Sequence, residues 1–201
     1  MIALIDYGVG NIRNVYRALT EIGMPVEITR DPAAVRRSEA IILPGVGAYR
    51  DAMENLRATG LIPCLAESVQ QGKWLLGICL GMQLLFEGSD EGGDYAGLGW
   101  LPGRIVRLET ALKIPHMGWN QLELTRPDPV TANLGEHPSV YFVHSYCLKT
   151  QDPDLVLATA DYDGPVPAIV RRGSVLGMQF HPEKSGAVGL QLLKNFKEMI
   201  R

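Results

Sequence analysis

Residues 77–81 (Gly-Ile-Cys-Leu-Gly) place a cysteine between two glycines at the end of an apolar run. We expect a strand over Trp74–Ile78 and a helix over Leu80–Phe86, so Cys79 would occupy a sharp strand-to-helix turn. Such a turn lifts the side chain out of the sheet edge, and the following helix N-terminus favours negative charge on the sulfur. A buried structural cysteine is the alternative interpretation. The flanking glycines favour a nucleophile.

A nucleophilic thiol needs a base, and one of the four histidines has a suitable context in residues 177–183 (Gly-Met-Gln-Phe-His-Pro-Glu). Pro182 restricts His181 to an extended conformation, which points residues i and i+2 to the same side. Glu183 could therefore orient the imidazole and stabilise its charged form. The alternative is a surface turn. The preceding strand-like run favours a catalytic Cys79–His181–Glu183 triad, because α/β active sites lie at the carboxyl ends of strands.

Backbone N–H groups could complete this site by binding the oxygen of a tetrahedral intermediate. Leu80 follows the nucleophile directly, and the turn 44–47 (Pro-Gly-Val-Gly) offers further donors at Val46 and Gly47. Each such donor is typically worth about 3–4 kcal/mol. Gln83 lies one helical turn after the nucleophile and could hold a polar substrate. A surface glutamine is the alternative.

The first half of the chain is predicted to build the parallel sheet that positions these turns. Its expected strands are short and continuously apolar, as is typical when helices cover both faces. The expected strands are Ile2–Ile5, Pro25–Ile28, Ala40–Leu43 and Trp74–Ile78. The expected helices cover Ile12–Ile22 with Asn11 as its cap, Ala48–Arg57 and Leu61–Gln71.

The second half is predicted to be rich in short strands, with a hairpin connection at residues 172–173 and a final helix over Gly189–Ile200. Residues 87–99 contain five glycines and four acids and read as a surface loop. The expected strands are Arg104–Leu108, Gln121–Leu124, Val140–Val143, Val156–Thr159, Ala168–Val170 and Val175–Gln179. We expect one α/β domain over residues 1–201, a mostly parallel sheet flanked by helices with an additional β-rich portion.

Composition excludes several other classes of protein. The formal charge is −3, without the basic excess of a nucleic-acid binder. No apolar run approaches the 18 residues of a membrane span, and three cysteines are too few for a disulfide framework. The glycine pairs at 8–10 and 45–47 lack the third glycine of a dinucleotide-binding motif. We expect a soluble protein of the reducing cytoplasm.

Taken together, these motifs resemble those of the class I, triad-type glutamine amidotransferases. Residues 77–83 resemble the nucleophile motif of that family, residues 179–183 its His/Glu motif and residues 44–47 its oxyanion strand. The resemblance implies that Cys79 attacks the side-chain amide of glutamine and that ammonia is handed to a synthase. It implies no cofactor and no metal.

Further stretches resemble one branch of the family, the glutaminase subunits of imidazole glycerol phosphate synthase. These are residues 6–11, 114–120, 141–146 and 184–185. The resemblance implies a heterodimer with a (β/α)₈-barrel cyclase, which makes imidazole glycerol phosphate and aminoimidazole carboxamide ribonucleotide in histidine biosynthesis. A triad that spans residues 79 to 183 also leaves no room for an ammonia-consuming domain within these 201 residues.

The same resemblance assigns roles to residues outside the triad. Gln83 and the backbone of residues 144–146 (His144, Ser145 and Tyr146) would hold the amino-acid end of glutamine. Residues expected to contact the partner are Asn11, Trp119, Tyr141 and Lys184. Core packing is the alternative for Trp119 and Tyr141.

Two alternative functions remain open from the sequence. The chain could be the glutaminase of a different synthase, such as anthranilate synthase. It could also be a catalytically silent interaction subunit, although the intact triad argues against that. Of all parts of the chain, residues 87–99 are the part to which the family resemblance assigns the least function.

Overall fold

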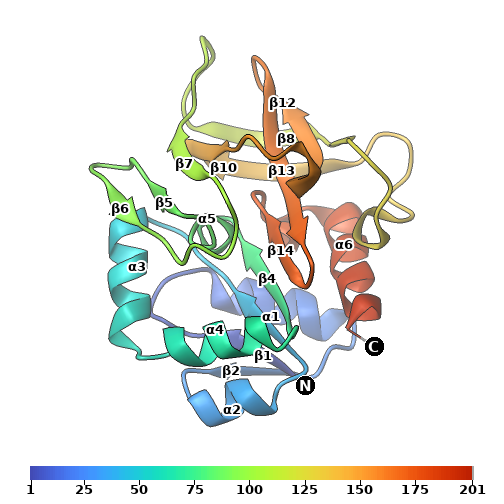
Figure 1. Cartoon of the computed structure of the whole chain (residues 1–201). Helices are drawn as coiled ribbons and strands as arrows, with labels where there is room; N and C mark the ends of the chain where they lie inside the picture. The colour runs from blue at the N-terminus through green and yellow to red at the C-terminus, as the bar shows by residue number, and fades with distance from the viewer. Residues whose placement is uncertain (201) are drawn as a thin grey trace.

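The computed structural model describes residues 1–200, and its central feature is an eight-stranded sheet (Figure 1). Five neighbouring strands run parallel and the other three continue the sheet antiparallel. In spatial order they are β2 (Val26–Thr29), β1 (Ile2–Ile5), β3 (Ala40–Leu43), β4 (Trp74–Ile78), β14 (Val175–Met178), β13 (Pro165–Arg172), β12 (Val156–Asp161) and β9 (Glu123–Leu124). The predicted α/β class with a mostly parallel sheet is confirmed.

Alternate residues of the parallel strands enter two separate cores. In β1, Ile2 and Leu4 pack with α1 and α6, whereas Ala3 and Ile5 pack with α3 and α4 on the opposite face. Figure 1 shows α3 and α6 on opposite sides of the sheet. The helices are α1 (Ile12–Glu21), α2 (Pro32–Arg37), α3 (Tyr49–Ala58), α4 (Ile62–Gln70), α5 (Leu80–Gln83) and α6 (Gly186–Met199). Burial of both faces explains why these strands have no polar alternation.

The strand order brings three predicted site segments to one edge of the sheet. Strand β4 lies between β3 and β14, and Gly77 pairs with Leu43 on one side and Gly177 on the other. Because the three strands are parallel, their carboxyl ends meet at the same edge. The turn after β3, the cysteine after β4 and the histidine after β14 are therefore neighbours.

The second half adds two small sheets beside this edge. One is an antiparallel ribbon of β8 (His116–Gln121) and β10 (Ser139–His144). The other has the order β11, β7, β5, β6. Its strands are β11 (Tyr146–Lys149), β7 (Arg104–Arg107), β5 (Gly88–Ser89) and β6 (Tyr95–Ala96). Three 3₁₀ turns complete the chain: η1 (Pro129–Thr131), η2 (Pro153–Leu155) and η3 (Pro182–Lys184).

Several predicted elements differ from the structure. The expected strand over 121–124 is divided between β8 and β9, and residues 87–99 form the β5–β6 hairpin instead of a plain loop. Helix α2 was not predicted, although Asp31 accepts a hydrogen bond from Ala33 N and Pro32 starts the helix. Its six residues are too few for a hydrophobic period to show.

Two predicted helix features are wrong in detail. Asn11 occupies the N-cap position of α1, but its side chain makes no capping hydrogen bond. Its backbone (φ −86°, ψ 57°) departs from the extended conformation that capping residues adopt. Helix α5 ends at Gln83 rather than at Phe86, so it is a single turn and its dipole acts on the cysteine less than we expected.

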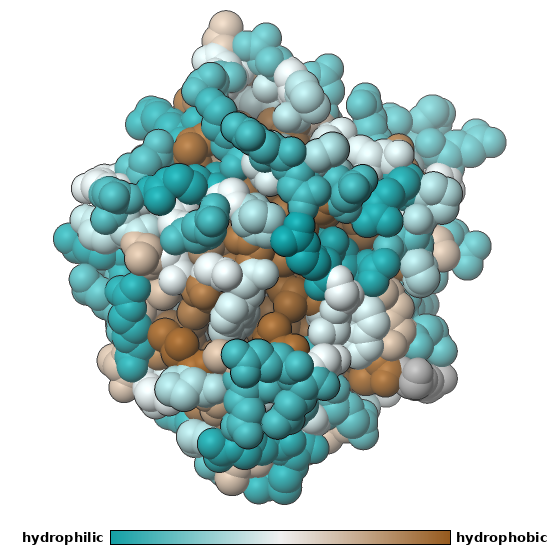
Figure 2. Space-filling model, viewed as in Figure 1, coloured by the Kyte–Doolittle hydropathy of each residue, from teal (hydrophilic) through white to brown (hydrophobic). Residues whose placement is uncertain are grey.

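On the face seen in Figure 2, hydrophobic side chains gather near the centre and hydrophilic ones surround them. Among residues 1–200, no helix combines the length and apolar character that crossing a membrane requires.

Candidate active site

Cys79 occupies a strained turn between β4 and α5. Its φ of +53° is unusual for a residue with a side chain, and its ψ is −113°. Close backbone contacts leave no room for a side chain at Gly77 and Gly81, the two glycines around it. A Cβ at Gly81 would lie 1.9 Å from the Leu43 carbonyl oxygen, and one at Gly77 would lie 2.7 Å from Gly81 O. The expected sharp turn is present, and only glycine fits on either side of the sulfur.

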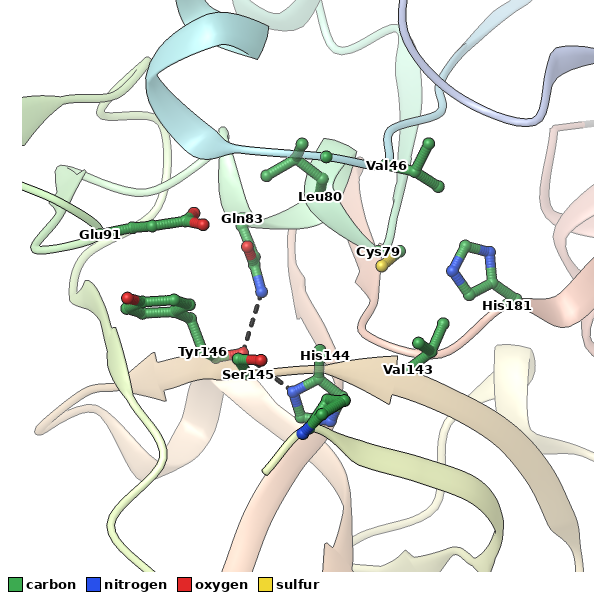
Figure 3. A pocket seen from close by; sticks show the side chains of 12 residues that line it. Val46, Cys79, Leu80, Gln83, Glu91, Val143, His144, Ser145, Tyr146 and His181 are labelled. Carbon is green, nitrogen blue, oxygen red and sulfur yellow. Dashed lines mark hydrogen bonds between the residues drawn. The ribbon is translucent and has the colours of Figure 1, made fainter. Parts of the chain in front are cut away.

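His181 and Glu183 form a buried hydrogen-bonded pair. His181 Nδ1 lies 2.8 Å from Glu183 Oε1, and the two side chains are 2% and 1% exposed. His181 has the predicted extended backbone (φ −100°, ψ 95°), but Glu183 lies in the 3₁₀ turn η3 rather than in a continued extended segment. The predicted pairing is present. His181 Nε2 has no hydrogen-bond partner within residues 1–200, and its ring lies beside Cys79 (Figure 3).

The electrostatic surroundings of His181 favour its protonated form. Burial alone lowers the pKa of an imidazole, but the side chains of Cys79 and Glu183 outweigh burial and raise the pKa of His181 to about 9. The imidazolium therefore persists at neutral pH, with one N–H directed at Glu183. It can donate a proton to a leaving group on a carbon atom that the neighbouring Cys79 sulfur attacks.

The turn after β3 packs directly against the cysteine turn. A Cβ at Gly45 would lie 2.6 Å from Gly81 N and 2.8 Å from the Tyr7 hydroxyl, which donates a 2.5 Å hydrogen bond to Pro44 O. Beyond it, Val46 and Gly47 (φ +106°) line the same cavity as Cys79. The backbone N–H groups of Val46, Gly47 and Leu80 form no hydrogen bond among residues 1–200. No acceptor among the described residues occupies them.

These residues surround a cavity of about 340 Å³. In Figure 3 the Cys79 and His181 side chains lie at one end and Glu91 lies at the other, with Gln83 between them. The lining residues are Val46, Gly47, Cys79, Leu80, Gln83, Glu91, Pro115, Val143, His144, Ser145, Tyr146 and His181. The cavity thus brings together the cysteine, the histidine, the backbone donors and all four residues expected to hold substrate.

Gln83 is buried, which rules out the surface alternative. Its amide nitrogen donates to Tyr146 O at 3.0 Å (Figure 3). It also donates to Gln179 Oε1 at 2.9 Å, so both N–H groups are used. The His144 ring is also engaged, because Nδ1 contacts Tyr146 O at 2.9 Å and Nε2 contacts His116 at 3.0 Å. A ligand can use the Gln83 amide oxygen and the backbone of this wall, but not the imidazole nitrogens of His144.

Glu91 is a site residue that the sequence analysis missed. It lies in the β5–β6 hairpin, and its Oε2 accepts a 3.0 Å hydrogen bond from Tyr49 N at the start of α3. It is the only carboxylate among the described residues that line the cavity. No spacing in the chain indicates its position, because the hairpin reaches the cavity by folding back onto α3.

Three of the four residues expected at a partner interface form a cluster next to the triad. Trp119 is 60% exposed, so core packing is excluded for it, and its ring packs edge-on against Tyr141. Lys184 Nζ lies 5.9 Å from the centre of the Tyr141 ring. The fourth residue, Asn11, is the N-cap of α1. Helix α1 packs against η3, the turn that contains Lys184. We call Trp119, Tyr141 and Lys184 the aromatic–lysine cluster.

Among residues 1–200, no group of three or more histidine, cysteine, aspartate and glutamate side chains is arranged to hold a metal ion.

The model of the family "Glutamine amidotransferase class-I" matches residues 3–199. Three similar relatives are all imidazole glycerol phosphate synthase subunits HisH. The one from Oceanobacillus iheyensis is 48% identical over the whole of both chains. Those from Shouchella clausii (50% identical, 100% of this chain and 99% of the relative) and Moorella thermoacetica (47%, 100% and 95%) match equally broadly.

Solved structures share the fold at lower sequence identity. A crystal structure of a glutamine amidotransferase superposes with a TM-score of 0.79 at 23% identity, covering 100% of this chain and 99% of the other. A chain of the PurLQS structure from Thermotoga maritima gives a TM-score of 0.79 at 22% identity, covering 100% and 98%.

Proposed function

The chain belongs to the class-I glutamine amidotransferase family, and from this premise we propose that it is the glutaminase subunit of an imidazole glycerol phosphate synthase. It hydrolyses glutamine to glutamate and ammonia, and a cyclase subunit uses the ammonia to make imidazole glycerol phosphate in histidine biosynthesis. The observation that carries the proposal is the strained Cys79 beside the buried His181–Glu183 pair in one cavity.

In the first half-reaction, the Cys79 thiolate attacks the side-chain amide carbon of glutamine. The carbonyl oxygen gains negative charge, which the backbone N–H groups of Val46, Gly47 and Leu80 stabilise. His181 donates the proton of its Nε2 to the amide nitrogen, the C–N bond breaks, and ammonia leaves. The glutamyl group remains on the sulfur as a thioester.

In the second half-reaction, water hydrolyses the thioester. Neutral His181 takes a proton from the water as it attacks the thioester carbon, and the C–S bond then breaks to release glutamate and the thiolate. Glu183 holds Nδ1 of the imidazole through the 2.8 Å contact, so the same ring serves as acid and then as base.

Acceptor groups at the other end of the cavity suit the ammonium group of glutamine. Glu91 contributes a carboxylate and Gln83 contributes its amide oxygen, whereas the amide N–H groups of Gln83 are already used. Glutamine has its reactive amide and its ammonium group at opposite ends, as the cavity has Cys79 and Glu91 (Figure 3). The backbone of residues 144–146 faces the substrate between them.

Replacing Glu91 with glutamine is expected to raise KM for glutamine about tenfold or more, because a hydrogen bond between charged groups is lost. kcat should fall much less, since Glu91 lies away from the reacting sulfur. Steady-state kinetics of glutamate release measure both values. Asp90→Asn is the matched control, since Asp90 is exposed in the same hairpin and does not line the cavity. Equal KM values for the two variants would remove Glu91 from the substrate site.

The partner is a (β/α)₈-barrel cyclase, and it docks on the aromatic–lysine cluster and Asn11. Support for this surface comes from exposed Trp119 and from Met117, which is 58% exposed on the same side of β8. Lys184 belongs to η3, the turn that also carries Glu183, so contact with the partner acts one residue away from the triad. The cytoplasmic location expected from the sequence stays a prediction.

Glutamate release from glutamine tests the function directly. We expect slow release by this chain alone and a large rise when the barrel cyclase and its ribonucleotide ligand are added. The Cys79→Ala variant should show no release under either condition. Fast release that the cyclase leaves unchanged would keep the triad and reject the assignment to this synthase.

A further inference from the structure

Two buried histidines, His116 and His144, play no part in the reaction steps above. They pair across the β8–β10 ribbon and are 2% and 6% exposed. The His116 ring is stacked between two aromatic rings, with centres 4.5 Å from Phe142 and 4.0 Å from Tyr162. Burial lowers the pKa of both histidines to about 4, so each ring carries a single proton at neutral pH.

The hydrogen bonds fix which nitrogen carries that proton in each ring. Tyr146 O is an acceptor, so the 2.9 Å contact requires a proton on His144 Nδ1. His144 Nε2 is then an acceptor and receives the proton of His116 Nδ1 at 3.0 Å. His116 Nε2 in turn accepts from the Asn120 amide at 3.2 Å, and the other N–H of that amide is anchored on Asp161 O at 2.8 Å. Every bond in the chain runs in one direction.

This chain of hydrogen bonds ends at the wall of the substrate cavity. Tyr146 O accepts both from His144 Nδ1 and from Gln83 Nε2, which lies 3.0 Å away. The second N–H of Gln83 is held by Gln179 Oε1 at 2.9 Å. The Gln83 amide is therefore held with its nitrogen toward the protein, and its oxygen is the atom left for a ligand (Figure 3).

We infer that Asn120, His116 and His144 are positioning residues that make Gln83 present an acceptor to the ammonium group of the substrate. If His144 carried its proton on Nε2, Nδ1 and Tyr146 O would be two acceptors in contact, and the carbonyl would move. Gln83 would then lose one of the two acceptors that orient its amide. The inference rests on the proposed function, because it takes glutamine as the substrate.

The substitution His116→Phe tests the chain of hydrogen bonds at a point away from the cavity. Phenylalanine preserves the stack between Phe142 and Tyr162 but cannot donate a proton to His144 Nε2. We expect KM for glutamine to rise about fivefold, the loss of roughly one hydrogen bond, and kcat to fall much less. Alkylation of Cys79 by iodoacetamide, which has no ammonium group, should keep its rate. The control is His137→Phe, at an exposed histidine outside the cavity.

A pair of substitutions at His144 gives a second test by rescue. The amide N–H of asparagine lies where Nδ1 lies in histidine and can still donate to Tyr146 O, whereas leucine has no donor. We expect His144→Asn to bind glutamine several-fold more tightly than His144→Leu, as judged by KM. Equal KM values for the two variants would contradict the inference.

The tautomers themselves can be observed by ¹⁵N NMR of the imidazoles, which needs no activity. We expect protonated Nδ1 in both His116 and His144 of the unaltered protein, and a proton on Nε2 of His144 there would overturn the inference. A wild-type KM in His116→Phe, or a parallel loss of kcat and alkylation rate, would also overturn it. If the unaltered protein with its cyclase releases no glutamate, the proposed function fails and the inferred contact with the substrate ammonium group fails with it, whereas the tautomers still decide whether the two histidines orient Gln83.

Discussion

Replacing His181 with asparagine is expected to lower kcat for glutamine hydrolysis by about 10³–10⁴-fold, with a much smaller change in KM. The substitution removes the acid that protonates ammonia in the first half-reaction and the base that activates water in the second. Glutamate release at saturating glutamine, in the complex with the cyclase, measures the effect. His137→Asn is the matched control because His137 is exposed. A loss of less than tenfold would assign proton transfer to another group.

The same residue gives a prediction about pH. The His181 pKa of about 9 lies above the ordinary imidazole value of 6.5, so the folded state holds this proton more tightly than the unfolded state. The resulting stabilisation is fully present below about pH 6.5 and is lost as the pH rises through 9. In Glu183→Gln, an NMR titration should give a lower pKa for His181, because a carboxylate that favours the imidazolium is gone.

Replacing Gly81 with alanine is expected to reduce the free energy of unfolding by about 4 kcal/mol, at the upper end for a single substitution. The new Cβ would lie 1.9 Å from the Leu43 carbonyl oxygen and 2.8 Å from its carbon. The clash with the Leu43 carbonyl group can be relieved only if β3 and the cysteine turn separate. That movement also displaces the turn 44–47. Urea unfolding measures the loss, and the folded fraction should hydrolyse glutamine poorly.

Gly60→Ala separates this contact from the general cost of replacing glycine. Gly60 has a φ of +69° and no atom within 4 Å of a Cβ, so alanine there suffers only the unfavourable backbone conformation. That cost is about 1–2 kcal/mol. Similar losses for the two variants would mean that the backbone around Gly81 relaxes at little cost, contrary to the packing described.

The parallel half of the fold could be predicted because its signals are local. Strands β1, β3 and β4 have the predicted bounds, since each is a short apolar run between polar or glycine-rich turns. The cysteine turn follows from the two glycines that flank it, and the His181–Glu183 contact joins residues two apart in sequence. The roles of these residues in catalysis stay predictions, which the experiments above test.

Features that depend on long-range packing could not be predicted from the sequence. Glu91 reaches the cavity only because the β5–β6 hairpin folds onto the start of α3, 42 residues earlier in the chain. His116 and His144 meet through the register of β8 and β10, which no local pattern determines. Helix α5 ends early because Leu85 N bonds to Met82 O, a tighter turn that propensity does not indicate.

The β8–β10 ribbon assigns alternate residues to different molecular tasks. In β8, His116 and Asn120 face inward to the hydrogen-bond chain, whereas Met117 and Trp119 face outward. Because a strand alternates sides at every residue, a substitution on the outer face leaves the inner hydrogen-bond chain in place. Inserting one residue before His116 would shift all of β8 by one position and exchange the two sets, so this strand tolerates substitutions on either side far better than a change in length.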